Sequence, residues 1–419
     1  MWDPYAEFQS ATLPNGLTVY AAHWPGRPWE AVGIVVYSGA KHDPEGLEGL
    51  AHFLEHLLSE NTKMPENEIE KFFEDQGGAV SFGETDYTDM CFRFFIPFDK
   101  EILGKSFSIF GHMLLHAKIE KSIKGERRVV IGEFNKEFPT VLDQELKARE
   151  RKALYGGTWL SRFVDIRGTS DSVQCITKED LQVFYDTHYT PKNMSVVAVG
   201  GFTLKELVDA LSESPFATKK KGTRTKVPRP AATVMPPSET RYVFEASKDP
   251  SRATPRKTAL YRSVAKLPGN ANRHALVIMS EMLDATLSEE VRVRRGWTYS
   301  IGSDWENFQR FKEFYINCES LSLKALDEID EVVEECISSL ANRKDLFERA
   351  KRRLIATSFM KDTNCREIRN DVMMDLAVRQ RITTLREFIE KTNQITMRDI
   401  RKLLKWLRPE RRWTLIVRP

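Results

Sequence analysis

Hydrophobic and polar residues follow two periods along this chain, and each period predicts one kind of element. Residues 89–97 alternate strictly between the two kinds, which predicts a strand with one apolar face. β-Branched and aromatic runs predict further strands at 17–22, 31–37, 195–201, 241–246, 257–266, 313–318 and 413–417. Apolar residues spaced three and four apart predict helices at 44–58, 66–76, 100–119, 120–138, 177–189, 205–211 and 273–287, with more between 325 and 380.

Strands and helices are mixed along the chain and do not alternate regularly. This order predicts an α+β fold of two similar α/β-sandwich domains, whose mixed, largely antiparallel sheets are covered by helices. Residues 216–239 are rich in Lys, Arg, Pro, Thr and Ser and lack an apolar period, as is typical of a linker. Because 419 residues exceed one compact domain, we predict domains at 1–215 and 240–419.

The helix predicted at 44–58 carries two histidines and a glutamate. His52, Glu55 and His56 are spaced so that all three project from one helical face. Leucines and an alanine form a separate apolar stripe that can anchor the helix in a core. Asp43 is the expected N-cap, and Pro44 is the expected first helical residue.

This trio suits a hydrolytic zinc site. A catalytic zinc ion takes three protein ligands and leaves one position for water. We expect His52 and His56 to be two of the ligands, and Glu55 to act as general base on the water. The order His-x-x-Glu-His reverses the common zinc-protease helix. This pattern should arise by chance in roughly one per cent of chains of this length, so it is fairly specific. The alternative is a helix that happens to carry two histidines.

A third ligand has to come from elsewhere. Glu126 and Glu133 lie two turns apart on one face of the helix predicted at 120–138. Glu133 is the better candidate for the third ligand, and Glu126 for a residue that orients a ligand. On composition alone, two glutamates on a solvated helix face are the simpler interpretation. A second pair, His112 and His116, has no acid between its members and is expected to be structural.

Composition excludes several classes of function. The chain has 63 basic and 60 acidic residues, and its net charge of +3 does not favour nucleic-acid binding. No apolar run reaches transmembrane length, and no signal peptide is visible, so we expect no membrane association. Five scattered cysteines are typical of reduced thiols in a cytoplasmic protein. No glycine-rich phosphate loop indicates a nucleotide cofactor.

These motifs together resemble the pitrilysin/insulin-degrading-enzyme family of inverted zinc peptidases, in particular its half-sized, processing-peptidase-like branch. The resemblance covers nearly the whole chain. It is carried by Leu13–Val19, by the motif His52–His56, by the acidic helix through Glu133 at the family's spacing, and by the stretch 168–200. It implies the processing-peptidase-like metalloenzyme fold, with Zn²⁺ bound by His52, His56 and Glu133 and with Glu126 behind them.

The second half adds a further element of the family. Residues 290–300 resemble its Arg-x-x-x-Gly-Leu-x-Tyr element, with Trp297 in place of leucine. The resemblance implies that Arg292 and Tyr299 position substrate, and that they serve the zinc site of a partner chain across a closed chamber. It implies a homodimer, while a heterodimer with an inactive homologue stays open. One departure, Ser81-Phe82 in place of the usual Asn-Ala, bears on specificity.

We therefore expect a zinc metalloendopeptidase that hydrolyses peptides or unfolded segments inside a closed dimeric chamber. The substrate is expected to add as a strand to a sheet edge. Two alternatives remain: a non-catalytic structural subunit of the same family, and a catalytic subunit that requires a distinct inactive partner.

Overall fold

The computed structural model describes residues 2–219, 221–246, 257–360 and 364–419. The chain divides into two compact units, and each is built from separate stretches of sequence. Residues 1–139, 163–227 and 360–386 form the first unit, and residues 140–162, 228–359 and 387–419 form the second. One boundary falls in segment 221–239, which forms no helix or strand. Two segments depart from the contiguous division expected from sequence: 140–162 joins the second unit and 360–386 the first.

The first unit contains a six-stranded sheet with the order β1-β2-β6-β3-β5-β4. Its strands are β1 (Gln9–Thr12), β2 (Thr18–His23), β3 (Trp29–Val36), β4 (Ala79–Ser81), β5 (Met90–Pro97) and β6 (Met194–Gly200). Only the β2–β6 pair is parallel. Nearly every residue of the central strands β3 and β6 is buried, because both sheet faces are covered.

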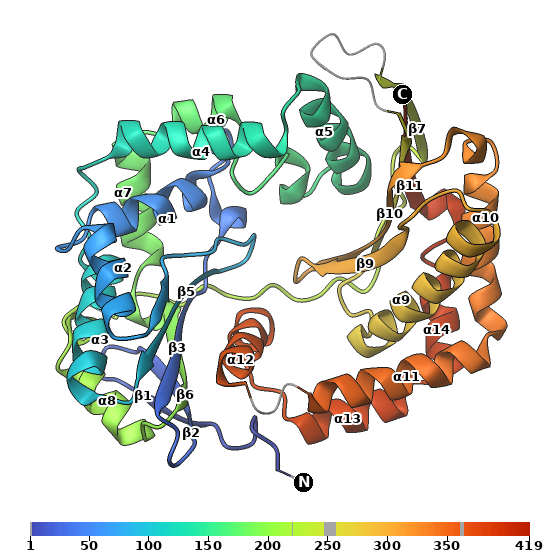
Figure 1. Cartoon of the computed structure of the whole chain (residues 1–419). Coiled ribbons are helices and arrows are strands. Elements are labelled where there is room, and N and C mark those ends of the chain that lie inside the picture. Colours follow the sequence, from blue (N-terminus) through green and yellow to red (C-terminus); the bar gives the residue numbers. More distant parts are fainter. Residues whose placement is uncertain (1, 220, 247–256, 361–363) are drawn as a thin grey trace. The chain divides into compact units, whose positions relative to one another are not determined.

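Helices cover one face of this sheet over a single apolar core (Figure 1). They are α1 (Leu50–Glu60), α2 (Glu66–Asp75), α3 (Lys100–Leu115), α7 (Lys178–His188) and α8 (Leu204–Ser212). Aromatic rings fill the space between sheet and helices, with Phe94 in contact with Phe73, Phe107 and Phe110. Two further helices, α4 (Ile123–Glu137) and α6 (Ser170–Cys175), pack near α1 and against each other.

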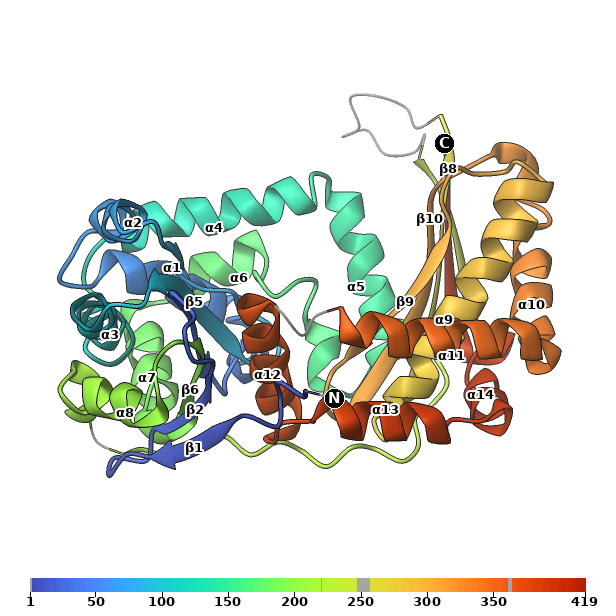
Figure 2. The same ribbon diagram turned by 60° about the horizontal axis from the view of Figure 1, so that its bottom comes forward.

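The opposite face of the first sheet is covered by α12 (Cys365–Arg379), which comes from near the end of the chain (Figures 1 and 2). Its apolar side packs on Val35, Tyr37 and Val197. Gly33 of β3 leaves the space that the sulfur of Met373 occupies, since a Cβ there would lie 2.1 Å from it. Arg369 donates hydrogen bonds to the carbonyls of Val32 and Phe94, 3.2 Å each.

The second unit contains a five-stranded sheet with the order β7-β11-β8-β10-β9. Its strands are β7 (Arg241–Glu245), β8 (Ala259–Pro268), β9 (Gly302–Asn307), β10 (Phe311–Leu321) and β11 (Arg412–Arg418). An apolar core joins one face to α9 (Arg273–Leu287), α10 (Ile329–Ser339), α11 (Lys344–Phe359) and α14 (Met397–Leu404). The remaining long helix is α13 (Leu385–Gln394). In the described residues, no helix is long and apolar enough to cross a membrane.

The other face of the second sheet meets α5 (Val141–Tyr155) through charged side chains. Glu150 accepts a 2.6 Å hydrogen bond from Arg262 of β8, and Glu313 of β10 pairs with both Arg262 and Arg151. Glu150, Arg151 and Glu313 are each less than 5% exposed. Buried charges of this kind are stable only when they are paired, so removing one partner should cost several kcal/mol.

The fold class predicted from sequence is confirmed: two α/β sandwiches, each with a mixed sheet in which antiparallel pairs predominate. Apart from the start of α1, the predicted strands and helices lie within a few residues of the observed ones. The sequence pattern did not single out β1, β4, β9, α5, α6, α13 and α14.

Glu30 gives the first unit a pH-dependent stability. This residue of β3 is fully buried, and burial raises the pKa of its carboxyl group to about 8, against the opposing backbone hydrogen bond from Phe202. The unfolded chain releases this proton near pH 4.5, whereas the folded chain retains it to about pH 8. The protonated Glu30 carboxyl group therefore contributes fully to the stability of the folded chain below pH 4.5, and this contribution is lost as the pH rises towards 8.

We predict that Glu30→Gln removes this slope. The measurement is urea unfolding between pH 5 and 8.5 with a chelator present. Between these limits, the free energy of unfolding of the variant should rise relative to that of the parent by on the order of 3 kcal/mol. Equal slopes in the two proteins would contradict the assignment.

Candidate metal centre

Helix α1 begins six residues later than the sequence predicted. Its first residue is Leu50, and Gly49 at the N-cap adopts the left-handed conformation with φ of 98°. The expected start at Asp43-Pro44 was wrong, but Asp43 still caps the helix from a distance. Its carboxylate accepts hydrogen bonds from the backbone N–H groups of Gly49 (2.8 Å) and Ala51 (2.9 Å). These N–H groups have no partner within the helix, so a buried carboxylate satisfies them.

Backbone contact also fixes the start of α1. A Cβ on Gly49 would lie 2.2 Å from the carbonyl oxygen of Arg167, and a Cβ on Gly168 would lie 1.9 Å from that of Glu48. Both glycines have positive φ, so neither position tolerates a side chain. The Ser172 hydroxyl donates to the Glu48 carbonyl at 2.7 Å. The end of α1 nearest the predicted motif is therefore held on several sides.

His52, His56 and Glu133 lie together, with one potential ligand atom from each within 4.8 Å of the other two. Glu133 Oε2, from α4, is 3.6 Å from His52 Nε2 and 3.7 Å from His56 Nε2. Donors about 2.1 Å from a tetrahedral zinc ion are separated by about 3.4 Å. Two imidazole nitrogens and a carboxylate at these distances fit Zn²⁺.

Each histidine is presented in a different way. His52 is 8% exposed, and burial, together with nearby His56 and Arg167, lowers its pKa to about 3. Its imidazole is therefore neutral, as a metal ligand must be. His56 places Nδ1 3.3 Å from Glu126 Oε2 and its other nitrogen towards Glu133. A carboxylate behind the imidazole fixes its tautomer and orientation, which is the role expected of Glu126.

Glu55 lies on the same helix beside this cluster but takes no part in it. Burial raises the pKa of its carboxyl group, opposed by nearby His56 and by a hydrogen bond from Thr85. That bond joins Thr85 Oγ1 to Glu55 Oε2 at 3.0 Å. Sequence reasoning missed Thr85, because nothing in the pattern links two residues thirty positions apart.

The second histidine pair sits differently. His116 Nε2 lies 3.0 Å from the Pro215 carbonyl oxygen and 3.0 Å from Thr218 Oγ1. His112 and His116 belong to no group of potential metal ligands among the described residues. The two contacts of His116 tie the end of α3 to residues 215–218.

Arg292 and Tyr299 lie next to each other in the second unit. The Arg292 guanidinium carbon is 4.8 Å from the centre of the Tyr299 ring, and 80% of Tyr299 is exposed. Arg292 belongs to a π-helical segment, Ser288–Arg294, that extends α9. Segments of this type are frequent at functional sites, and Arg292 of this one lies exposed beside Tyr299, which follows the segment.

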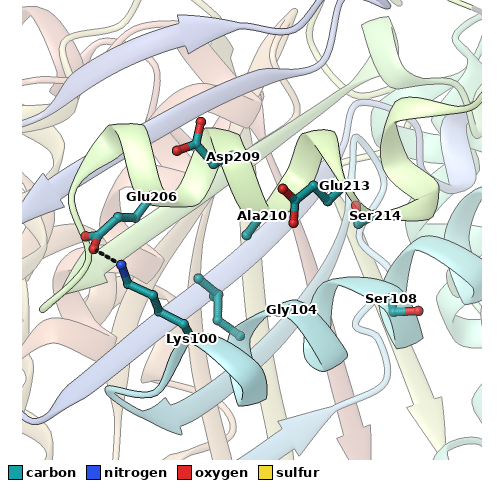
Figure 3. A pocket seen from close by; sticks show the side chains of 9 residues that line it. Lys100, Gly104, Ser108, Glu206, Asp209, Ala210, Glu213 and Ser214 are labelled. Carbon is teal, nitrogen blue, oxygen red and sulfur yellow. Dashed lines mark ion pairs between the residues drawn. The ribbon is translucent and has the colours of Figure 1, made fainter.

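A pocket of about 310 Å³ lies elsewhere in the first unit, between α3 and α8 (Figure 3). Glu206 of α8 faces Lys100 of α3 and pairs with it at 2.9 Å. Glu206 also accepts the Thr203 N–H in the N-terminal cap of α8. None of the lining residues belongs to the histidine–glutamate cluster, so this pocket adds nothing to it.

Two family sequence models match the chain. The one described as "Insulinase (Peptidase family M16)" matches residues 18–156, and the one described as "Peptidase M16 inactive domain" matches residues 176–354. The chain therefore belongs to the M16 family of peptidases. His52, Glu55, His56 and Glu133 all lie in the part matched by the first model.

Among curated proteins, the chain is 30% identical over 220 residues to the mitochondrial-processing peptidase subunit beta of Caenorhabditis elegans, covering 50% of this chain and 45% of that one. It is 28% identical over 206 residues to the human cytochrome b-c1 complex subunit 1, covering 48% and 41%. The chain spans less than half the length of these two relatives. An uncharacterized zinc protease of Streptomyces coelicolor is 26% identical over 343 residues, covering 77% and 71%.

Solved structures agree on the fold. A structure described as the peptidase M16 inactive domain from Pseudomonas fluorescens superposes with a TM-score of 0.82 at 16% identity, covering 98% of both chains. Pitrilysin superposes with a TM-score of 0.73 at 16% identity, and the match covers 98% of this chain and 45% of pitrilysin.

We predict that Glu126→Gln weakens zinc binding by about 10- to 100-fold, because His56 loses the carboxylate that orients it. Competition with a chromophoric chelator measures the affinity directly. Glu137→Gln, an exposed change on the same helix, is the matched control and should bind like the parent. Equal affinities in all three proteins would remove Glu126 from the site.

Proposed function

We propose that this chain is a zinc-dependent metalloendopeptidase that cleaves peptides or unfolded polypeptide segments. The observation that carries the proposal is the convergence of His52, His56 and Glu133 beside the partly buried carboxyl group of Glu55. Three ligands and a separate acid are the minimum that this chemistry needs. The same four residues follow the spacing of the family to which the chain belongs.

His52 Nε2, His56 Nε2 and Glu133 Oε2 would hold the ion. When bound, Zn²⁺ supplies Lewis-acid polarisation of the scissile carbonyl and lowers the pKa of a water molecule towards neutrality. Glu126 keeps His56 in one tautomer, so that His56 Nε2 offers a lone pair.

Glu55 is the proposed general base. Its carboxyl group takes the proton of the attacking water and passes it to the nitrogen of the departing amine. A raised pKa suits both proton transfers. It makes the carboxylate a stronger base towards water, and it lets the carboxyl group hold the proton until the amine takes it. Burial is the largest cause of this shift.

The substrate is proposed to add as a strand to an edge of the first sheet. β4 (Ala79–Ser81) is the last strand in that sheet and pairs on one side with β5. Backbone hydrogen bonds to such an edge bind an extended peptide with modest sequence preference. Ser81 ends this strand and Phe82 follows it, so we propose that they shape specificity more than rate.

We propose a homodimer in which Arg292 and Tyr299 of one protomer serve the metal site of the other. Two alternatives have support. The relatives include a cytochrome b-c1 complex subunit, which favours a structural role, and a processing-peptidase beta subunit, which favours a distinct partner. We further propose a reducing, cytoplasmic location, since the structure pairs none of the five cysteines.

We predict that Glu55→Gln lowers the rate of peptide cleavage by about 10²- to 10⁴-fold, while the zinc content stays at the parent level. Gln keeps the size of the side chain but cannot accept the proton. The measurement pairs elemental analysis with cleavage of an internally quenched peptide.

His112→Ala and His52→Ala extend this test. The first should keep both zinc and activity, and the second should lose both. Two results would contradict the peptidase proposal and favour the structural role. One is a parent protein without zinc, and the other is equal residual cleavage in the parent and in Glu55→Gln.

We predict that two inactive variants restore each other if the site is shared between protomers. The Glu55→Gln and Arg292→Ala proteins are mixed, dissociated and reassembled. Half of the resulting dimers are mixed, and each mixed dimer holds one complete site where a parent dimer holds two. The mixture should therefore regain about one quarter of the parent activity.

Each variant reassembled alone is the control and should stay inactive. Native mass spectrometry verifies the dimer before and after mixing. A dimer whose mixture stays inactive would place both elements in one protomer's site, and a monomeric parent would favour the requirement for a different partner.

A further inference from the structure

The loop between β4 and β5 approaches the carboxyl group of Glu55 with two residues that have no role in the site described above. Thr85 is 5% exposed, and its hydroxyl donates to Glu55 Oε2 at 3.0 Å. Gly83 lies against the same group: a Cβ there would be 2.3 Å from Glu55 Oε1 and 2.5 Å from its carboxyl carbon. One residue therefore binds the carboxylate, and the other leaves the space that it occupies.

This loop is itself held in place. Thr85 pairs with Met90 in an isolated antiparallel bridge, and the Glu84 carbonyl accepts the Cys91 N–H at 3.0 Å. Glu84 also pairs with Arg93 of β5 at 2.7 Å. The hydroxyl of Thr85 is thus fixed to the sheet, whereas Glu55 is attached to helix α1. The hydrogen bond sets where the end of a flexible side chain lies relative to the metal ligands on the same helix.

We propose that Thr85 and Gly83 are positioning residues for Glu55, and that they determine the catalytic rate without contributing to metal binding. The inference rests on the proposed peptidase function. Proton transfer needs donor and acceptor within hydrogen-bonding reach, and a displacement of 1 Å can cost about 100-fold in rate. A side chain as long as glutamate does not hold its carboxylate to that tolerance unaided.

Two substitutions displace the carboxylate by independent routes. Thr85→Val removes the donor and keeps the shape of the side chain. Gly83→Ala keeps the donor and places a methyl group where Glu55 Oε1 lies. The atoms it meets are the mobile end of Glu55 and not backbone, so the fold has a way to accommodate it. Thr85→Ser keeps the hydroxyl and should restore the parent behaviour.

Matched controls separate positioning from general damage. Thr88→Val alters the same loop at the same burial, 5% exposed, but its hydroxyl donates to Asp89. Gly104→Ala adds a methyl group on α3 where no atom lies within 4 Å. Neither control touches Glu55.

The experiment measures kcat, KM and zinc content for all variants, and the visible spectrum of each protein loaded with Co²⁺, which reports the surroundings of the bound ion. Thr85→Val and Gly83→Ala should lower kcat about 10- to 100-fold, with KM within about twofold, full zinc content and shifted Co²⁺ bands. Thr85→Ser and the two controls should resemble the parent. Parent-like kcat in Thr85→Val, or equal losses in the Val and Ser variants, would overturn the inference.

The spectra keep this inference separable from the proposed function. A parent that binds the ion but cleaves no peptide overturns the peptidase proposal alone. The positioning of Glu55 then stands if Thr85→Val and Gly83→Ala shift the Co²⁺ bands and the controls do not, and it falls if the bands are unchanged. A parent that binds no ion overturns both.

Discussion

The site depends on how the first turn of α1 is held. The N–H groups that open a helix have no partner inside it, and here the buried carboxylate of Asp43 accepts two of them. Gly49 and Gly168 then allow backbone to touch backbone where any side chain would intervene. His52, Glu55 and His56 project from the turns that follow. Their positions are therefore set by main-chain contacts, which are far stiffer than the long side chains that they carry.

Carboxylates in this region differ in environment, and the differences match their proposed roles. Glu133 has 43% of its side chain exposed, as suits a ligand that also faces an open position. Glu126 is about half as exposed and sits behind His56. Glu55 is held by a threonine and crowded by the backbone of Gly83. Residues of one chemical type are thus suited to the three proposed roles of ligand, orienting group and base, because each meets a different amount of water and a different neighbour.

Sequence reasoning reached the fold class and the pair His52 and His56 from local periodicity and spacing, whereas Glu133 was singled out by the resemblance to the family. It failed where partners are distant or polar. Helix α5 was not recognised, since Glu150 and Arg151 interrupt the apolar residues on its buried side. The start of α1 was misplaced, since Asp43 caps it across six residues. Thr85 was missed because its bond to Glu55 exists only once β4 and β5 have formed beside α1.

The packing of α12 on the first sheet has a consequence for the order of assembly. The strands of that sheet are complete by residue 200, yet one of its faces is covered by residues 365–379. During synthesis from the N-terminus, Val35, Tyr37 and Val197 stay uncovered until more than a hundred further residues have emerged. The nascent chain must then keep an apolar sheet face from associating with others, so the ribosome-bound intermediate is a natural client for chaperones. For the same reason, a fragment that ends at the linker lacks one wall of its own core.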